Sequence, residues 1–134
     1  MHYGVCSNCG ASGIVEKHHV FFKSKARALK NCNLNLVDLC QDCHRGTNGV
    51  HGPHGHNLDI KLKKIKQNSL ISLLESVSML DDKLYVLQLE NVSTVLRVPL
   101  NELLKVTKNI KPFKCGYYKT IDVVRELQGG KLYE

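Results

Sequence analysis

The chain has few aromatic residues, no tryptophan and no long apolar run. Its 134 residues contain no stretch of about eighteen or more apolar residues, so we expect no transmembrane helix. Residues 1–10 lack the basic start and apolar centre of a secretory signal peptide. No internal repeat or low-complexity segment is present. With an ordinary apolar content of 43%, the sequence predicts a cytoplasmic protein of one ordinary domain or two very small ones.

Acidic residues are in the minority, with 12 against 19 lysines and arginines, for a formal net charge of +7. An excess of positive charge favours a polyanionic partner. A zinc ion on four thiolates carries a charge of about −2, which would still leave the protein at roughly +5. Such a charge would still suit a DNA-binding protein without identifying the polyanion, and the partner that we expect is double-stranded DNA.

Four of the six cysteines form two Cys-X-X-Cys pairs, namely Cys6/Cys9 and Cys40/Cys43. Disulfides are the alternative, but this spacing is typical of a zinc site and favours metal binding. Four thiolates complete a tetrahedral Zn²⁺ with no vacant position, which makes such an ion structural. Cys32 and Cys115 are left as ordinary thiols.

Histidine is concentrated in the N-terminal part of the chain. All histidines except His2 lie between His18 and His56. Adjacent histidines alone are a weak signal, but the expected zinc uses only thiolates and leaves the imidazoles for a second task. The histidines are therefore the candidates for a reactive site.

Three elements occur in a fixed order: His18-His19-Val20, then Asn35 in Asn-Leu-Val-X-Leu-Cys, then His44 directly after Cys43. This set resembles the HNH endonuclease family. The run Cys43-His-Arg-Gly-Thr-Asn-Gly-Val-His51-Gly is similar to phage-encoded members, and the nested cysteine pairs match the zinc-stapled branch. The resemblance covers about residues 3–66. It implies a ββα-metal unit, in which a β-hairpin and the following helix hold one catalytic metal.

The same resemblance implies a metal-dependent endonuclease that hydrolyses DNA to 5′ phosphates and 3′ hydroxyls. His19 would be the general base, His18 and His44 would bind the catalytic metal, and Asn35 would fix the hairpin that aims His19. A neutral imidazole can take a proton from water at cellular pH. The expected catalytic ion is Mg²⁺ or Mn²⁺, with Zn²⁺ or Ni²⁺ as alternatives, and it would stabilise charge on the leaving 3′ oxygen.

The third protein ligand departs from the simplest family pattern. Asn48 stands four residues after His44, and the next histidine is His51. Two glycines between them would let His51 fold back to the metal, while Asn48 or water could fill the position instead. We favour His51, and expect His54 and His56 to lie outside the site.

The remainder of the chain shows helical periodicity. Apolar residues at three- and four-residue steps predict a helix or helical pair over residues 57–80. Two short helices are expected within residues 90–108, broken at Pro99, because proline disfavours helical geometry in the residue before it. A turn or small wing over residues 111–118 would lead into a final helix over residues 120–127.

This pattern resembles the small winged helix-turn-helix modules of the excisionase and MerR type, in which the second helix enters the major groove. The alternative is a small helical core that packs against the nuclease or a second copy of the chain, as a homodimer. In a DNA-binding module, the residues that face DNA would be Asn101, Lys105, Lys108, Lys111 and Lys114.

The sequence thus predicts an α+β protein with a zinc-stapled nuclease domain over residues 1–66 and a mainly helical module over residues 67–134. The competing function is a non-catalytic, zinc-containing DNA-binding regulator. An RNA nuclease is a third reading, because both polymers share the phosphodiester bond. The few aromatic residues available for base stacking argue against single-stranded RNA.

Overall fold

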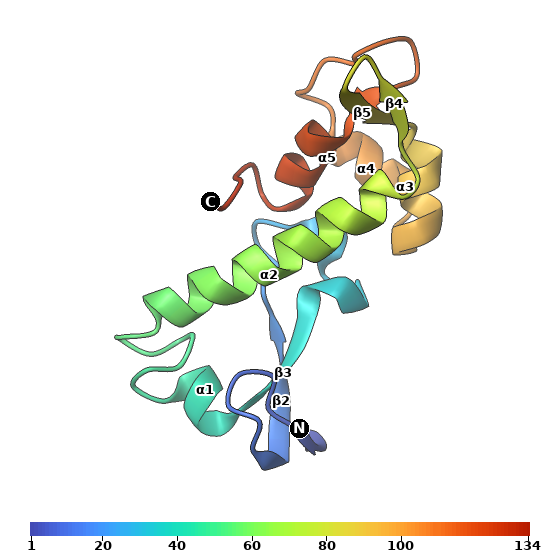
Figure 1. Ribbon diagram of the computed structural model, residues 1–134. Coiled ribbons are helices and arrows are strands. Elements are labelled where there is room, and N and C mark those ends of the chain that lie inside the picture. Colours follow the sequence, from blue (N-terminus) through green and yellow to red (C-terminus); the bar gives the residue numbers. More distant parts are fainter.

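The computed structural model describes residues 1–134, and its N-terminal part is a three-stranded antiparallel sheet in the order β1-β2-β3 (Figure 1). The strands are β1 (His2–Val5), β2 (Ser12–His19) and β3 (Leu36–Cys40). Two 3₁₀ turns, η1 (Arg27–Leu29) and η2 (Asn33–Asn35), lie between β2 and β3. The short helix α1 (Gln41–Arg45) follows β3 directly.

The register of β2 and β3 decides which side chains face α1. His18 pairs with Val37 and Glu16 pairs with Leu39, so these residues share one face of the sheet. Val20 and Leu39 belong to a small buried cluster that also includes Cys6, Val50 and Leu62. This cluster packs the turn after β1, which carries Cys6, against the sheet and against the helix that contains Leu62.

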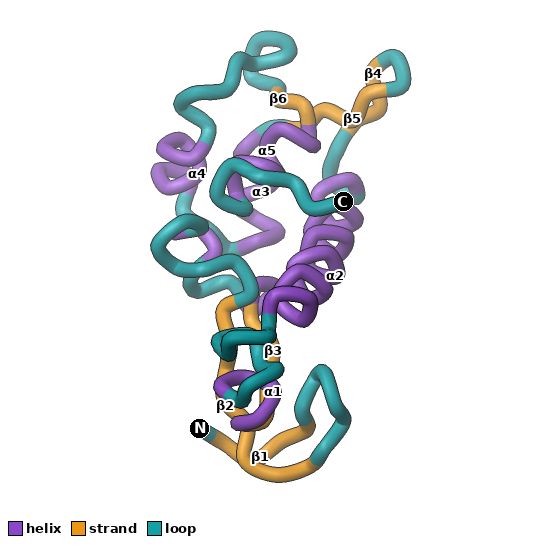
Figure 2. Tube along the Cα trace, turned by 90° about the vertical axis from the view of Figure 1, so that its left-hand side faces the viewer, coloured by secondary structure: helices purple, strands orange, loops and turns teal.

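The helix α2 (His56–Glu75) crosses the middle of the molecule and connects its two parts (Figures 1 and 2). The expected boundary at residue 66 lies inside this unbroken helix. Its apolar face contributes Leu62 to the small cluster and Leu70 and Leu74 to the main core. The main core also includes Leu29 of η1, so the N-terminal part supplies side chains to the C-terminal core.

The C-terminal part is a second three-stranded antiparallel sheet packed with helices. Its strands, in the order β4-β5-β6, are β4 (Met79–Asp81), β5 (Leu84–Leu87) and β6 (Tyr118–Lys119). Its helices are α3 (Leu89–Leu96), α4 (Leu100–Val106) and α5 (Thr120–Leu127). The α+β class, the break at Pro99 and the final helix over residues 120–127 are confirmed.

The expectation of helix up to residue 80 was wrong, because α2 ends at Glu75 and Leu80 lies in β4. The cause is the β4–β5 hairpin, whose two turn residues Asp82 and Lys83 have φ values of 48° and 70°. A two-residue turn with both φ values positive matches the twist of antiparallel strands. Asp-Lys lacks the glycine that usually marks this turn, so the periodicity of the leucines was extended too far. The C-terminal part is consequently less helical than expected.

None of the helices combines the length and the apolar character that crossing a membrane requires.

Candidate functional site

Four cysteines converge at one end of the N-terminal sheet. Cys6 and Cys9 lie on the knuckle that follows β1, Cys40 ends β3 and Cys43 lies in α1. Their sulfur atoms all lie within 4.8 Å of one another, and the Cys9 and Cys40 Sγ atoms are 3.8 Å apart. Tetrahedral zinc with Zn–S bonds of about 2.3 Å requires sulfurs about 3.8 Å apart. The cluster could therefore hold a structural Zn²⁺, and the sulfurs are too far apart for disulfide bonds.

The protonation chemistry of this cluster fits a bound cation. Burial opposes ionisation of Cys6, but the backbone amides of Cys9, Cys40 and Asn8 together lower the pKa of its thiol to about 6. Asn8 donates to the sulfur of Cys43, yet burial and the neighbouring thiols raise the pKa of Cys43 to about 12. Four adjacent thiols cannot all ionise unless a cation balances their charge.

Three histidines form a second cluster, separate from the cysteines. His18, His44 and His51 each contribute one ring nitrogen to this cluster, and these three nitrogens all lie within 4.8 Å of one another. Their ring centroids are 4.9–5.2 Å apart. His18 and His44 are buried, and Nε2 of His18 is a buried polar atom with no hydrogen-bond partner. An orphaned imidazole nitrogen that faces two others has the donor chemistry of a metal site.

His51 reaches this cluster because the loop between α1 and α2 folds back on α1. The His51 amide donates to the His44 carbonyl oxygen at 3.0 Å, and the Val50 amide donates to the Cys43 carbonyl at 2.9 Å. A Cβ on Gly52 would overlap the carbonyl oxygen of Gly46, so only glycine allows this backbone packing. Of the candidates for the third position, the structure places His51 with His18 and His44.

Glu16 holds the ring of His44. Its Oε1 accepts a hydrogen bond from Nδ1 of His44 at 3.0 Å and another from Nε of Arg45 at 3.2 Å. The bond from His44, together with Arg45, lowers the pKa of the Glu16 carboxyl. Because Nδ1 donates to Glu16, the lone pair of neutral His44 lies on Nε2, the nitrogen available to a metal.

His19 is adjacent to the three-histidine cluster and is fixed by a backbone carbonyl. Its Nε2 lies 2.8 Å from the Lys30 carbonyl oxygen, which can only accept a hydrogen bond. Nε2 therefore carries the proton in neutral His19, and the lone pair lies on Nδ1. This is the tautomer of a ring that can take a proton at Nδ1.

Asn35 clamps the chain just beyond His19. Its buried side chain accepts from the Phe21 amide at 2.7 Å and donates to the Phe21 carbonyl at 2.9 Å. The Asn35 carbonyl also accepts from the Val20 amide at 2.9 Å. These bonds tie the end of β2 to η2, and so determine the direction in which β2 carries its two histidines.

The histidines line an open cleft of about 330 Å³. Phe22 lies beside two of them, with its ring centroid 6.4 Å from that of His18 and 6.1 Å from that of His51. Burial, followed by the charges of the other histidines and Lys63, lowers the pKa of His18 to about 4. Burial and His44 also lower the pKa of His51. Both rings are therefore biased toward the neutral form that binds metals.

The residues expected to face DNA lie outside this cleft, and all five are exposed. Asn101 and Lys105 lie on α4, and the other three are Lys108, Lys111 and Lys114 in the segment that leads to β6. Lys105 forms an ion pair with Glu102 at 3.4 Å, and Lys114 forms an ion pair with Asp81. The structure brings none of them together with the histidines.

Three residues of the site were not identified from the sequence. Glu16 and Lys30 contact His44 and His19, and Phe22 lines the cleft. Glu16 could have been found, because it stands two residues before His18 and alternate strand residues share a face. The carbonyl of Lys30 gives no sequence signal, since any residue provides one. Comparisons with protein-family models, curated proteins and solved structures give no match for this chain.

Proposed function

We propose that the protein is a metal-dependent endonuclease that hydrolyses phosphodiester bonds in DNA. The observation that carries the proposal is the pairing of two sites in one cleft. His18, His44 and His51 could hold a divalent ion, and the adjacent His19 has its free lone pair on Nδ1. Phosphodiester hydrolysis requires a base and a centre of positive charge, and the cleft supplies a place for both.

His19 would take a proton from a water molecule at Nδ1, and the water oxygen would form the new bond to phosphorus. The bond from phosphorus to the 3′ oxygen breaks, and its electron pair leaves with that oxygen. A divalent ion held in the cleft would polarise the phosphate and stabilise the charge on the leaving oxygen. The leaving 3′ oxygen would take up a proton from water, so the products would be a 5′ phosphate and a 3′ hydroxyl.

The donor set bears on the identity of the ion. Three imidazole nitrogens suit Zn²⁺ or Ni²⁺ best, and of the two ions that prefer oxygen ligands, Mn²⁺ accepts imidazole more readily than Mg²⁺. Glu16 supports this set from behind His44, as carboxylates commonly do for metal-binding histidines. We propose Mn²⁺ ahead of Mg²⁺ as the activating ion, and a separate Zn²⁺ on the four cysteines as a structural ion.

The test is the nicking of supercoiled plasmid by zinc-loaded protein with added Mg²⁺, Mn²⁺, Ni²⁺ or chelator. The wild type should nick only with a divalent ion, and His19→Ala should lose nicking while it keeps its fold and its zinc. His54→Ala is the matched control, because His54 is an exposed histidine outside the cluster. Equal nicking by His19→Ala and wild type would remove His19 as the base. A wild type that binds DNA without nicking it would favour the regulator.

A further inference from the structure

Two further cavities neighbour the histidine cleft. Ser24 lines both the cleft and a cavity of about 370 Å³. Arg27, Ala28 and Glu102 line both that cavity and a third one of about 420 Å³. The shared residues make the three cavities successive neighbours, and we call the three together the basic groove.

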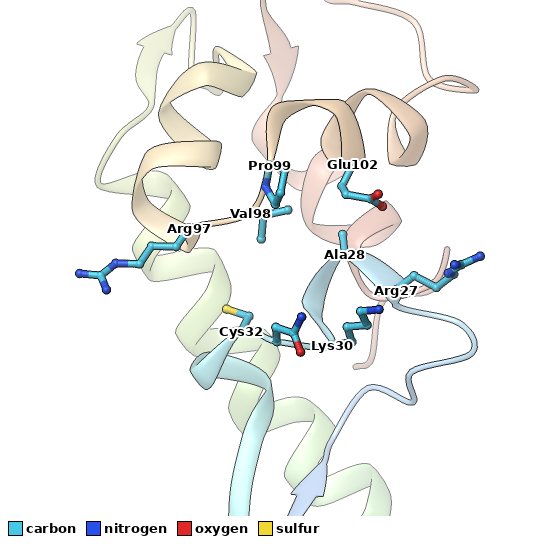
Figure 3. Close-up of a pocket in the computed structure, with 9 residues that line it drawn as sticks. Arg27, Ala28, Lys30, Cys32, Arg97, Val98, Pro99 and Glu102 are labelled. Carbon is cyan, nitrogen blue, oxygen red and sulfur yellow. The ribbon is translucent and has the colours of Figure 1, made fainter.

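The basic groove is a seam between the two parts of the chain. One wall is the segment Ser24–Asn31, which includes η1, and the other is the turn between α3 and α4 together with α4 itself (Figure 3). The apolar floor of its far end is formed by Ala28, Cys32 and Val98. Cys32 and Val98 belong to the main core, so both walls are anchored in one packed interior.

The charge of this groove is strongly positive. Exposed basic side chains line its whole length, namely Lys23, Lys25, Arg27, Lys30, Arg97 and Lys105. Lys17 also lines the cleft, but the carboxylate of Asp38, 3.9 Å away, offsets its charge. The two acids on the groove are Glu102, which pairs with Lys105 of the same groove, and Glu126, which pairs with Arg125 outside it. Five of the six basic side chains therefore keep an unpaired charge.

Arg97 stands at the far end of the groove in a left-handed conformation, with φ of 55° and ψ of 40°. A residue other than glycine is uncommon in this region, and the conformation ends α3 and starts the turn to α4. Figure 3 shows Arg97 at one end of the cavity and Arg27 at the other, with both guanidinium groups directed outward. Two exposed guanidinium groups, one at each end of an apolar floor, can each bind phosphate oxygens in a bidentate manner.

We propose that duplex DNA lies along the basic groove, so that the Ser24–Asn31 segment and the α3–α4 turn together deliver its backbone to the histidine cleft. Apart from the histidines of the cleft, Phe22 is the only aromatic residue among those that line the three cavities. Single-stranded nucleic acid is usually held by aromatic platforms for its bases, so the lining favours a duplex contacted through phosphate. The proposal rests on the proposed nuclease, because one of the three cavities of the groove is the histidine cleft. Its test, however, measures DNA binding alone.

The experiment compares charge-neutralising pairs in the full-length, zinc-loaded protein carrying His19→Ala, without added divalent ions. Binding of a fluorescein-labelled DNA duplex is followed by anisotropy over a series of salt concentrations. The groove pair is Arg27→Gln with Arg97→Gln. The matched control is Lys61→Gln with Lys64→Gln, which removes the same charge from exposed positions of α2 that line none of the three cavities.

The groove pair should bind about tenfold more weakly, and the slope of log K against log salt should become shallower by about 2, because each lost phosphate contact contributes about 0.9. The control pair should bind like the parent. Equal losses in both pairs, or no loss in either, would overturn the groove. A third pair, Lys108→Gln with Lys111→Gln, changes the segment that follows α4. A loss of DNA affinity confined to this pair would overturn the groove in favour of contacts from that segment.

The two proposals can fail separately. If the wild type does not nick plasmid but the groove pair still loses DNA affinity, the groove stands and the nuclease falls. If the wild type nicks plasmid and the groove pair binds DNA as tightly as its His19→Ala parent, the nuclease stands and the groove falls.

Discussion

The carboxylate of Glu16 lies 3.0 Å from Nδ1 of His44, although 28 residues separate them in the chain. Glu16 reaches His44 because β2 pairs with β3 and α1 follows β3 without a loop. The contact leaves the lone pair of neutral His44 on Nε2, in a ring whose centroid lies 5.2 Å from that of His18 and 4.9 Å from that of His51. The metal chemistry that we propose for the cleft therefore depends on a residue that would not itself touch the ion.

Glu16→Gln should weaken Mn²⁺ binding at the cleft by about 10- to 100-fold, the usual cost of removing such a supporting carboxylate. The amide is nearly the same size, but it lacks the charge that favours a polarised imidazole N–H. Binding can be measured by titration with Mn²⁺ and detection of the free ion by electron paramagnetic resonance.

Asp38→Asn is the matched control for Glu16→Gln. Asp38 is a carboxylate of the same sheet, but its contacts are with His2 and Lys17. If the two variants bind Mn²⁺ equally well, Glu16 has no role in orienting His44.

Gly52→Ala should abolish Mn²⁺ binding at the cleft as effectively as His51→Ala does. The added methyl group would overlap the carbonyl oxygen of Gly46, so the loop must open and carry His51 away. Zinc at the four cysteines should remain, because none of its four ligands lies on this loop. Retention of wild-type Mn²⁺ affinity in Gly52→Ala, alongside its loss in His51→Ala, would contradict the folded-back loop.

Asn35→Ala should destabilise the protein by about 3 kcal/mol, because it leaves the buried amide and carbonyl of Phe21 without partners. Asn35→Asp keeps the acceptor and loses the donor, so its stability should fall between those of the wild type and Asn35→Ala. The free energy of unfolding follows from urea titration at constant zinc.

The control for Asn35 is Asn33→Ala, an exposed residue of the same 3₁₀ turn. Its unfolding midpoint should match that of the wild type. An Asn35→Ala protein as stable as Asn33→Ala would show that the Phe21 clamp contributes nothing measurable.

Cys9→Ser should lose its structural zinc to a chelator concentration that leaves the wild type loaded, because one of four thiolate ligands is replaced by a poor one. Cys115→Ser is the matched control, since both cysteines are exposed and only Cys9 belongs to the cluster. Zinc content and the absorption of Co²⁺-substituted protein report the outcome. Equal zinc retention by the two variants would exclude a four-cysteine site.

Those features that depend on residue type and short spacing could be predicted from the sequence. The two Cys-X-X-Cys pairs indicated one cluster, and the structure brings all four sulfurs together. Proline at position 99 indicated the break between α3 and α4, and the apolar period indicated α5. The β4–β5 hairpin was missed because its turn residues, Asp82 and Lys83, take positive φ without glycine.

What the sequence by itself determined, therefore, was the chemistry available: thiols for zinc, a set of imidazoles, and an excess of positive charge. Only the tertiary structure decided which groups meet. Glu16 faces His44 through strand register, and His51 joins the cluster through a fold of backbone on backbone that only small residues permit. Arg27 and Arg97 come to one groove because Leu29 and Val98 share a core. Such contacts arise from packing between segments far apart in the chain, and the spacing of residues within one segment does not specify them.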